Sequence, residues 1–320
     1  MTTRIIGTGS AIPETIVTND ELSHIVETSD EWILSRTGIQ KRRIAKQETT
    51  VSLAADAGRA ALKNSGIEAA ELDLIIVSTC SPDSFVPCTA CEVQKALGAQ
   101  RAAAFDLNAA CSGFLFALNT AHSYIKSGFY ENALIIGAET LSKLVDWKER
   151  STCVLFGDGA GAAVVQKNAL GIIDMIQKSD GEIGDALTCQ ARKVQNIFIQ
   201  QEEVMDYITM DGQAIFRFAL TRVPECILEL LEKNRIDKSE IKYFVLHQAN
   251  RRIIQSVAKR LKIEEEKIPV NLDIYGNTSA ASIPILLDEM NRKGMLQKGD
   301  KIVLSGFGGG LTWGATLIEW

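Results

Sequence analysis

The sequence predicts an α/β protein that consists of two similar halves. Two observations predict this fold: short apolar runs alternate with helical patterns, and the same order of elements occurs twice along the 320 residues. The composition, with 46% hydrophobic and 23% charged residues, is that of a globular protein. It excludes a disordered chain and a small disulfide scaffold.

Four apolar runs are continuous rather than alternating, which is typical of strands that are covered on both faces. They lie at residues 73–78, 134–137, 243–246 and 301–304. Further strands are predicted over residues 103–107 and 268–272. Helices are predicted over residues 52–65, 112–126, 251–262 and 282–292.

The repeated order of elements predicts the domain organisation. Residues 54–79 resemble residues 223–248, and residues 132–165 resemble residues 300–314, at an offset of about 164 to 169 residues. We therefore expect an N-terminal half over residues 1–170 and a C-terminal half over residues 171–320. Equivalent loops of the two halves should then meet at one site.

Three polar side chains follow the ends of predicted strands. Cys111 comes after the strand at 103–107, His247 ends the strand at 243–246, and Asn277 comes after residues 268–272. Ligands of open α/β sheets bind beyond the carboxyl ends of the strands. We therefore expect these three side chains to converge.

Each of these residues also has a purely structural interpretation. Cys111 opens a predicted helix, whose N-terminal amides would favour the thiolate, but most free cysteines are buried and inert. Asn277 has the sequence context of a turn or a helix cap. The glycines at 308–310 suit either a tight turn or N–H groups aimed at an oxyanion. Of the other histidines, His24 is expected at the surface and His122 in the core.

Charge and cysteine content exclude several function classes. A net charge of −6 argues against nucleic acid as the main partner. No run of 18 apolar residues predicts a membrane span, and the N-terminus lacks an export signal, so a cytoplasmic location is expected. The seven cysteines lack framework spacing and are expected to be free thiols. Cys88 and Cys91 form a single CxxC without a second pair, so no metal site is predicted.

Six motifs resemble the signatures of the β-ketoacyl-acyl carrier protein synthase III family, in order along nearly the whole chain. They lie at residues 28–39, 106–114, 157–163, 247–250, 276–282 and 306–314. The resemblance implies a thiolase-like, five-layered αβαβα fold made of the two duplicated halves, and a homodimer. It also implies the first condensation of fatty acid synthesis. An acyl-CoA primer acylates Cys111, and malonyl-acyl carrier protein decarboxylates and attacks that thioester, so that 3-oxoacyl-carrier protein, CO₂ and CoA are released. No cofactor is implied, because acyl-CoA is a substrate.

The same resemblance implies roles for individual residues. Cys111 is the nucleophile, His247 and Asn277 hydrogen-bond the malonyl thioester carbonyl, and the N–H groups of Cys111 and Gly309 form the oxyanion hole. Further residues are implied by position: Trp32 and Arg150 around the CoA adenine; Thr28, Arg36 and Asn250 on the nucleotide or pantetheine; Phe85, Val86 and Phe307 in the primer pocket; and Arg217, Arg252, Lys259 and Arg260 on the carrier protein.

Two features depart from the family pattern. Val86 stands where some members carry an aromatic residue, which predicts that branched or longer primers are accepted as well as acetyl-CoA. Residues 185–206 form a longer segment than usual, with Cys189 and Arg192 of unassigned purpose.

Three alternatives remain at this point. A condensing enzyme or acyltransferase of secondary metabolism would use the same three residues. A catalytically silent partner subunit typically lacks the nucleophile, so the presence of Cys111, His247 and Asn277 argues against it. A thiol- or metal-sensing protein would be supported by bound zinc.

Overall fold

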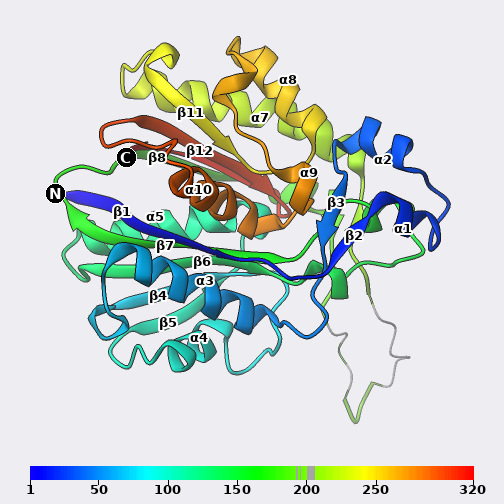
Figure 1. The fold of residues 1–320 in the computed structure, drawn as a ribbon, viewed down its shortest axis with the longest axis horizontal. Helices are drawn as coiled ribbons and strands as arrows, with labels where there is room; N and C mark the ends of the chain where they lie inside the picture. The colour runs from blue at the N-terminus through cyan, green and yellow to red at the C-terminus, as the bar shows by residue number, and fades with distance from the viewer. Residues whose placement is uncertain (192–193, 195, 200–205) are drawn as a thin grey trace.

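The computed structural model describes residues 1–191, 194, 196–199 and 206–320. Two β-sheets lie nearly parallel to each other, with helices between them and on both outer faces (Figure 1). The layers alternate as αβαβα, as the sequence resemblance implied.

The first sheet has five strands in the order β1-β7-β6-β4-β5. Its strands are β1 (Thr2–Ala11), β7 (Gly159–Asn168), β6 (Asn132–Glu139), β4 (Leu74–Ser78) and β5 (Ala103–Leu107). Strands β6, β4 and β5 run parallel, whereas β7 is antiparallel to both of its neighbours. Every residue of β4 is buried, which explains why its sequence is apolar without alternation.

The second sheet has four strands in the order β11-β12-β13-β8. They are β11 (Ile241–Leu246), β12 (Lys301–Gly308), β13 (Thr312–Glu319) and β8 (Ile172–Ser179). Strands β11 and β12 are parallel, and the remaining pairs are antiparallel. All strands of the first sheet come from residues 2–168 and all strands of the second from residues 172–319.

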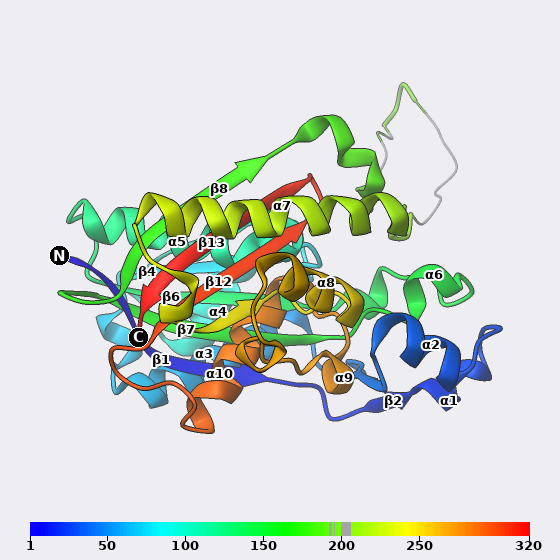
Figure 2. The ribbon, with the colours of Figure 1, turned by 90° about the horizontal axis from the view of Figure 1, so that it is seen from above.

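Helices lie between the two sheets and on their outer faces (Figures 1 and 2). Helices α5 (Gly113–Lys126) and α10 (Ser282–Arg292) lie between the sheets, and both contact strands of each sheet. Helices α3 (Thr50–Ser65) and α4 (Thr89–Leu97) cover the first sheet, while α7 (Gly212–Lys233) and α8 (Arg251–Leu261) cover the second. Residues Gly7 and Gly9 of β1 allow α3 to approach closely, since a Cβ at either would stand 2.6 Å or less from the helix backbone.

Smaller elements complete the chain. A separate ribbon pairs β2 (Ile16–Thr18) with β3 (Lys41–Arg43), and another pairs β9 (Leu187–Thr188) with β10 (Thr209–Met210). Short helices are α1 (Asn19–Ser23), α2 (Asp30–Thr37), α6 (Arg150–Cys153) and α9 (Leu272–Tyr275). Segments of 3₁₀ helix are η1 (Ala69–Glu71), η2 (Ala110–Ser112), η3 (Leu141–Lys143), η4 (Gly181–Ala186, with a kink at Ile183), η5 (Lys238–Glu240), η6 (Glu265–Lys267) and η7 (Ser279–Ala281).

The predicted strand over 268–272 is wrong, because these residues form a loop that leads into α9. Pro269 lacks a backbone N–H, which removes one donor that a strand would use. A second backbone donor is used elsewhere, because the N–H of Asn271 donates to the side-chain Oε1 of Gln248 at 3.1 Å. The other predicted strands and helices form within a few residues of their expected bounds.

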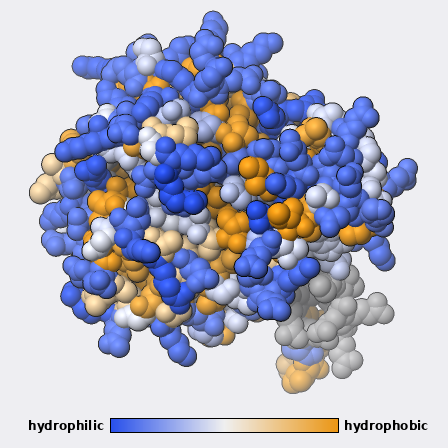
Figure 3. All heavy atoms as spheres, in the orientation of Figure 1, coloured by the Kyte–Doolittle hydropathy of each residue, from blue (hydrophilic) through white to orange (hydrophobic). Residues whose placement is uncertain are grey.

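The surface agrees with the composition of a globular chain. In the orientation of Figure 1, hydrophilic side chains cover most of the molecule and apolar ones appear in small groups between them (Figure 3). None of the helices in the described ranges combines the length and the apolar character that a membrane span requires.

Candidate active site

Cys111, His247 and Asn277 line one cavity of about 120 Å³. Cys111 lies in η2, between β5 and α5; His247 follows β11; and Asn277 lies between α9 and η7. Phe307 and Gly308, at the carboxyl end of β12, form another side of the cavity. The structure thus brings together the three side chains for which the strand ends predicted convergence.

The Cys111 thiol is protonated in the resting chain. The side chain is 7% exposed, and its burial raises the pKa of the thiol to about 12. The expectation of a thiolate favoured by the helix N-terminus is therefore wrong for this state. Desolvation outweighs the effect of the few amides at the start of α5, because the sulfur is enclosed by β12 and η7 as well as by its own turn.

The backbone holds Cys111 against the end of β12. Ala110 adopts a positive φ of 45°, which turns the chain sharply before the nucleophile. Gly308 packs on the other side, where an added Cβ would stand 2.4 Å from the backbone nitrogen of Cys111. A side chain at 308 would displace the cysteine.

His247 is neutral and its ring is fixed by two neighbours. Burial lowers the pKa of the imidazole to about 3, because the charged form cannot be solvated there. Its Nδ1 lies 2.7 Å from Oγ of Ser282, and the ring packs edge-on against Phe307 with centroids 5.5 Å apart. The same Ser282 oxygen accepts the backbone N–H of Gln248 at 3.3 Å.

Asn277 is held by its backbone and oriented by its side chain. Its N–H donates to the carbonyl of Leu155 at 2.9 Å, and its carbonyl accepts the N–H of Gly157 at 3.0 Å. The side-chain Oδ1 accepts the backbone N–H of Ser279 at 2.9 Å. The NH₂ group, which is the donor end of the amide, is therefore the end left for the cavity.

Gly309 lies one residue beyond the cavity wall. Gly308 and Cys111 line the cavity, while a Cβ on Gly309 would approach Ala110 and the carbonyl of Leu187 at 3.4 to 3.6 Å. Gly309 thus lies next to the turn that carries Cys111, and its share in an oxyanion hole stays a prediction.

The residues expected around CoA gather where α2, α6 and α8 meet. Arg150 lies over the Trp32 ring at 4.5 Å from its centroid, and Arg36 contacts the same ring at 5.0 Å. Arg150 and Trp32 therefore touch, and an adenine would fit between them only after Arg150 moves. The Nδ2 of Asn250 donates to the carbonyl of Arg36 at 3.1 Å, which ties α8 to α2.

Thr28, just before α2, has a side-chain hydroxyl without a hydrogen-bond partner. Its Oγ1 is buried and has no hydrogen-bond partner. A buried hydroxyl without a partner is uncommon in proteins and is costly. A ligand that donates or accepts here would satisfy it.

Two of the three residues expected in the primer pocket lie elsewhere. Phe307 lines the cavity, but Phe85 and Val86 are 79% and 88% exposed and do not. They belong to the loop between β4 and α4, whose end is bonded to β5 because the N–H groups of Thr89 and Ala90 donate to Asp106. Within one chain, the expectation that they line the pocket is therefore wrong.

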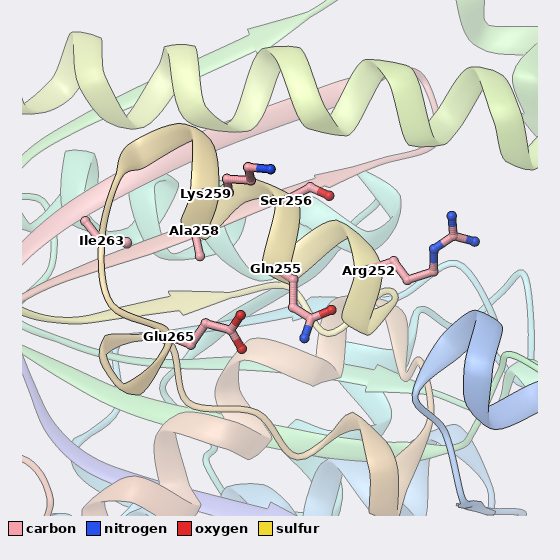
Figure 4. A pocket seen from close by; sticks show the side chains of 7 residues that line it. All are labelled: Arg252, Gln255, Ser256, Ala258, Lys259, Ile263 and Glu265. Carbon is pink, nitrogen blue, oxygen red and sulfur yellow. The ribbon is translucent and has the colours of Figure 1, made fainter.

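The basic residues expected to receive a carrier protein are exposed and lie on α7 and α8. Arg252 and Lys259 line a shallow hollow on the outer side of α8, together with Gln255 and Glu265 (Figure 4). Arg252 also contacts the ring of Phe216, at 5.7 Å. Arg260 donates to the carbonyl of Leu220 and so joins α8 to α7, and Arg217 lies on α7 itself.

Other expectations concern residues outside the cavity. His122 is a core residue, 4% exposed and hydrogen-bonded to Thr3 at 3.0 Å, as predicted. His24 is exposed at the end of α1. Cys189 is exposed, whereas Arg192 lies outside the described residues. Across the described ranges no group of histidine, cysteine and carboxylate side chains is arranged to hold a metal ion.

Sequence reasoning missed four residues around the cavity: Cys80, Glu139, Ser279 and Ser282. Glu139 carried a signal, because it is a carboxylate at the carboxyl end of the apolar run that forms β6. It is fully buried and accepts hydrogen bonds from Ser81 and Ser279. Ser279 and Ser282 lie within the motif at residues 276–282, but their contacts with Glu139 and His247 join distant parts of the sequence.

Comparisons with known proteins agree with the motifs. Residues 105–181 match the family 3-Oxoacyl-[acyl-carrier-protein (ACP)] synthase III, and residues 231–320 match its C-terminal domain. A beta-ketoacyl-[acyl-carrier-protein] synthase III from Clostridium botulinum is 54% identical over 99% of this chain and 98% of its own length.

Solved structures give the same result. The 3-oxoacyl-[acyl-carrier-protein] synthase III of Aquifex aeolicus superimposes with a TM-score of 0.93 at 46% identity, covering 99% of this chain and 100% of that one. The priming β-ketosynthase of the R1128 polyketide pathway has a TM-score of 0.93 at 35% identity, covering 99% and 96%. The chain belongs to the β-ketoacyl-acyl carrier protein synthase III family of acyltransferases.

Proposed function

We propose that Cys111 is acylated by a short acyl-CoA and that malonyl-acyl carrier protein then condenses with the acyl group. The observation that carries this proposal is the cavity that Cys111 shares with His247 and Asn277. The thiol attacks the thioester carbonyl, and CoA leaves. A covalent acyl-enzyme divides one difficult condensation into two easier steps. The product is a 3-oxoacyl-carrier protein, with CO₂, and the reaction starts a fatty acid.

Decarboxylation of the malonyl group needs donors for the enolate oxygen that develops. The NH₂ group of Asn277 is the free end of that amide, because its Oδ1 is already occupied by Ser279. His247 supplies the second donor as a neutral ring. Since the Ser282 oxygen accepts from Gln248, its hydroxyl proton is free to bond Nδ1 of His247, which leaves the His247 proton on Nε2. Each such donor is worth roughly 3–4 kcal/mol in the transition state.

The CoA nucleotide binds at the mouth formed by α2, α6 and α8. Trp32 and Arg150 lie on either side of the adenine once Arg150 has moved off the indole, and Arg36 offers positive charge to the nucleotide. The unpartnered hydroxyl of Thr28 and the amide of Asn250 supply polar contacts. The exposed arginines and Lys259 on α7 and α8 suit an acidic carrier protein, and they would steer its approach in a salt-dependent way.

The protein acts as a homodimer that joins along β5. This strand is one edge of the first sheet, and no other strand among the described residues pairs with its outer side. Phe85 and Val86, the two large apolar side chains of the adjacent loop, are exposed. An unpaired strand edge beside exposed apolar residues favours pairing with another chain. Sedimentation analysis tests this, and a monomer at micromolar concentration would refute it.

Intact-mass measurement tests the acylation. The protein is incubated with acetyl-CoA and with isobutyryl-CoA, and one acyl mass per chain is expected on Cys111. A Cys111→Ser variant should gain no mass. Label that persists on this variant would show that another residue is the acceptor and would overturn the proposal. Adding malonyl-acyl carrier protein should then release the label as 3-oxoacyl product.

A further inference from the structure

The orientation of the Asn277 amide depends on a single hydrogen bond. Its Oδ1 accepts the backbone N–H of Ser279 at 2.9 Å. Among the residues that the structure describes, no other group hydrogen-bonds this amide. A backbone N–H can pair only with the oxygen end of an amide, so this bond leaves the NH₂ end for the cavity. The proposed donor to the enolate oxygen therefore depends on where the Ser279 N–H points.

Ser279 presents this N–H from an unusual backbone conformation. Its φ is 49°, in the left-handed region that residues with a side chain rarely adopt. Such a conformation persists only where the surrounding structure holds it. Two contacts do so here: the N–H bonds Asn277, and the hydroxyl donates to Oε1 of Glu139 at 3.1 Å. Because φ is the rotation about the bond between N and Cα, a contact on each side of that bond fixes it.

The Glu139 side chain is itself held in place. Glu139 ends β6 and is 0% exposed. Its carboxyl group accepts the backbone N–H of Cys80 at 3.1 Å and the hydroxyl of Ser81. Strand β6 also packs directly on η7, since a Cβ on Gly137 would stand 2.3 Å from the carbonyl oxygen of Ala280. The first half of the chain thus holds η7 through a carboxyl group whose own position is fixed.

We propose that Glu139 is a positioning residue for the condensation step and acts on Asn277 through Ser279. This inference rests on the proposed role of Asn277 as a donor to the enolate oxygen. The carboxyl group of Glu139 holds the Ser279 hydroxyl, so the Ser279 backbone keeps its left-handed conformation. The Ser279 N–H then keeps the NH₂ group of Asn277 directed at the cavity. Acylation of Cys111 does not use that donor, so these contacts serve the second half-reaction only.

Two other roles for the Ser279 hydroxyl predict different results. A hydroxyl that itself bonds the substrate cannot be replaced by a residue that lacks it. A hydroxyl that only stabilises the fold would alter both half-reactions to the same degree. A hydroxyl that sets the backbone can be replaced by glycine, because glycine adopts a positive φ without strain, whereas alanine does not.

The experiment measures the two half-reactions separately: acylation by acetyl-CoA, and condensation of preformed acyl-enzyme with saturating malonyl-acyl carrier protein. In Ser279→Ala the condensation rate constant should fall about tenfold, the effect of losing one hydrogen bond that holds the donor. In Ser279→Gly it should stay within about twofold of wild type. Acylation should stay within about twofold in both. Thr8→Ala is the matched control, since it removes a hydroxyl that donates to another buried carboxylate, Asp288, at 2.9 Å, and should leave both half-reactions unchanged.

Variants of Glu139 test the other end of the contact. Glu139→Gln keeps the length and still bonds the Ser279 hydroxyl, which both donates and accepts, so condensation should stay within about twofold. Glu139→Met fills similar space without a polar end and should slow condensation alone, by about tenfold. In the Ser279→Gly background, Glu139→Met should slow condensation by less than about twofold, because the glycine backbone no longer needs the carboxyl group.

Equal condensation rates in Ser279→Ala and Ser279→Gly would overturn the proposal, whether both are normal or both are reduced. A fall in acylation as large as the fall in condensation would overturn it as well. These two comparisons decide the matter if Glu139→Met does not fold. A wild-type chain that no acyl-CoA labels, or an Asn277→Ala variant that condenses at the wild-type rate, would instead refute the proposed function on which the inference rests.

Discussion

Replacing Ser282 with alanine should separate the two half-reactions. The hydroxyl contacts Nδ1 of His247 at 2.7 Å and accepts the Gln248 N–H at 3.3 Å, and the residue is 2% exposed. Without it, the tautomer with the proton on Nδ1 becomes competitive, and the ring then presents an acceptor to the enolate oxygen. Loss of that donor is worth roughly 3–4 kcal/mol, or about 100- to 1000-fold in the condensation rate. Acylation of Cys111 should change by less than about threefold, because Ser282 does not contact the thiol in the hydrogen bonds described.

The assay uses enzyme acylated beforehand. The acyl-enzyme is isolated, malonyl-acyl carrier protein is added, and 3-oxoacyl product is followed by mass spectrometry. Ser305→Ala is the matched control, since it removes another buried hydroxyl, one that bonds the carbonyl of Gly314. Condensation by Ser282→Ala at the Ser305→Ala rate would refute the assignment of the tautomer.

Three further outcomes are expected. Gly308→Ala should abolish acylation and lower the melting temperature, because the new Cβ would meet the Cys111 nitrogen at 2.4 Å; an acylating, stable variant would contradict this packing. Trp32→Ala should raise the KM for acyl-CoA about tenfold with little change in the rate at saturation, whereas an unchanged KM would remove Trp32 from the CoA site. Condensation by preformed acyl-enzyme should show no ionisation near pH 6.5 from His247, since burial lowers the pKa of that ring to about 3 and it stays neutral above that value; a limb near 6.5 that disappears in His247→Asn would contradict the neutral donor.

Much of the fold follows from local sequence patterns. The continuous apolar runs predict β4, β6, β11 and β12, because strands buried on both faces exclude polar residues. Cys111, His247 and Asn277 converge as expected, although only Cys111 and His247 follow a strand; Asn277 follows α9, so the argument from strand ends does not hold for it. The false strand at 268–272 shows the limit: its apolar pattern is that of a strand, but the Gln248 side chain takes a backbone donor that the pattern does not reveal.

The protonation state of the side chains in the site was less predictable from the sequence. The helix at residue 113 suggested a thiolate, yet the pKa of Cys111 is raised because β12 and η7 exclude water from the sulfur. These neighbours lie more than 150 residues away along the chain. The exposure of Phe85 and Val86 likewise depends on the path of their loop, and the hydrogen bonds of Glu139 come from two other segments, the loop after β4 and η7.

The backbone bonds between Asn277 and the stretch at Leu155 and Gly157 have a consequence for biosynthesis. They join the loop before β7 to the loop before η7 at the cavity wall, and so link the first half of the chain to the second beside the nucleophile. A nascent chain of 170 residues contains Cys111 but neither His247 nor Asn277, which are the two proposed donors. The growing polypeptide is thereby kept from condensing acyl groups until its translation is nearly finished.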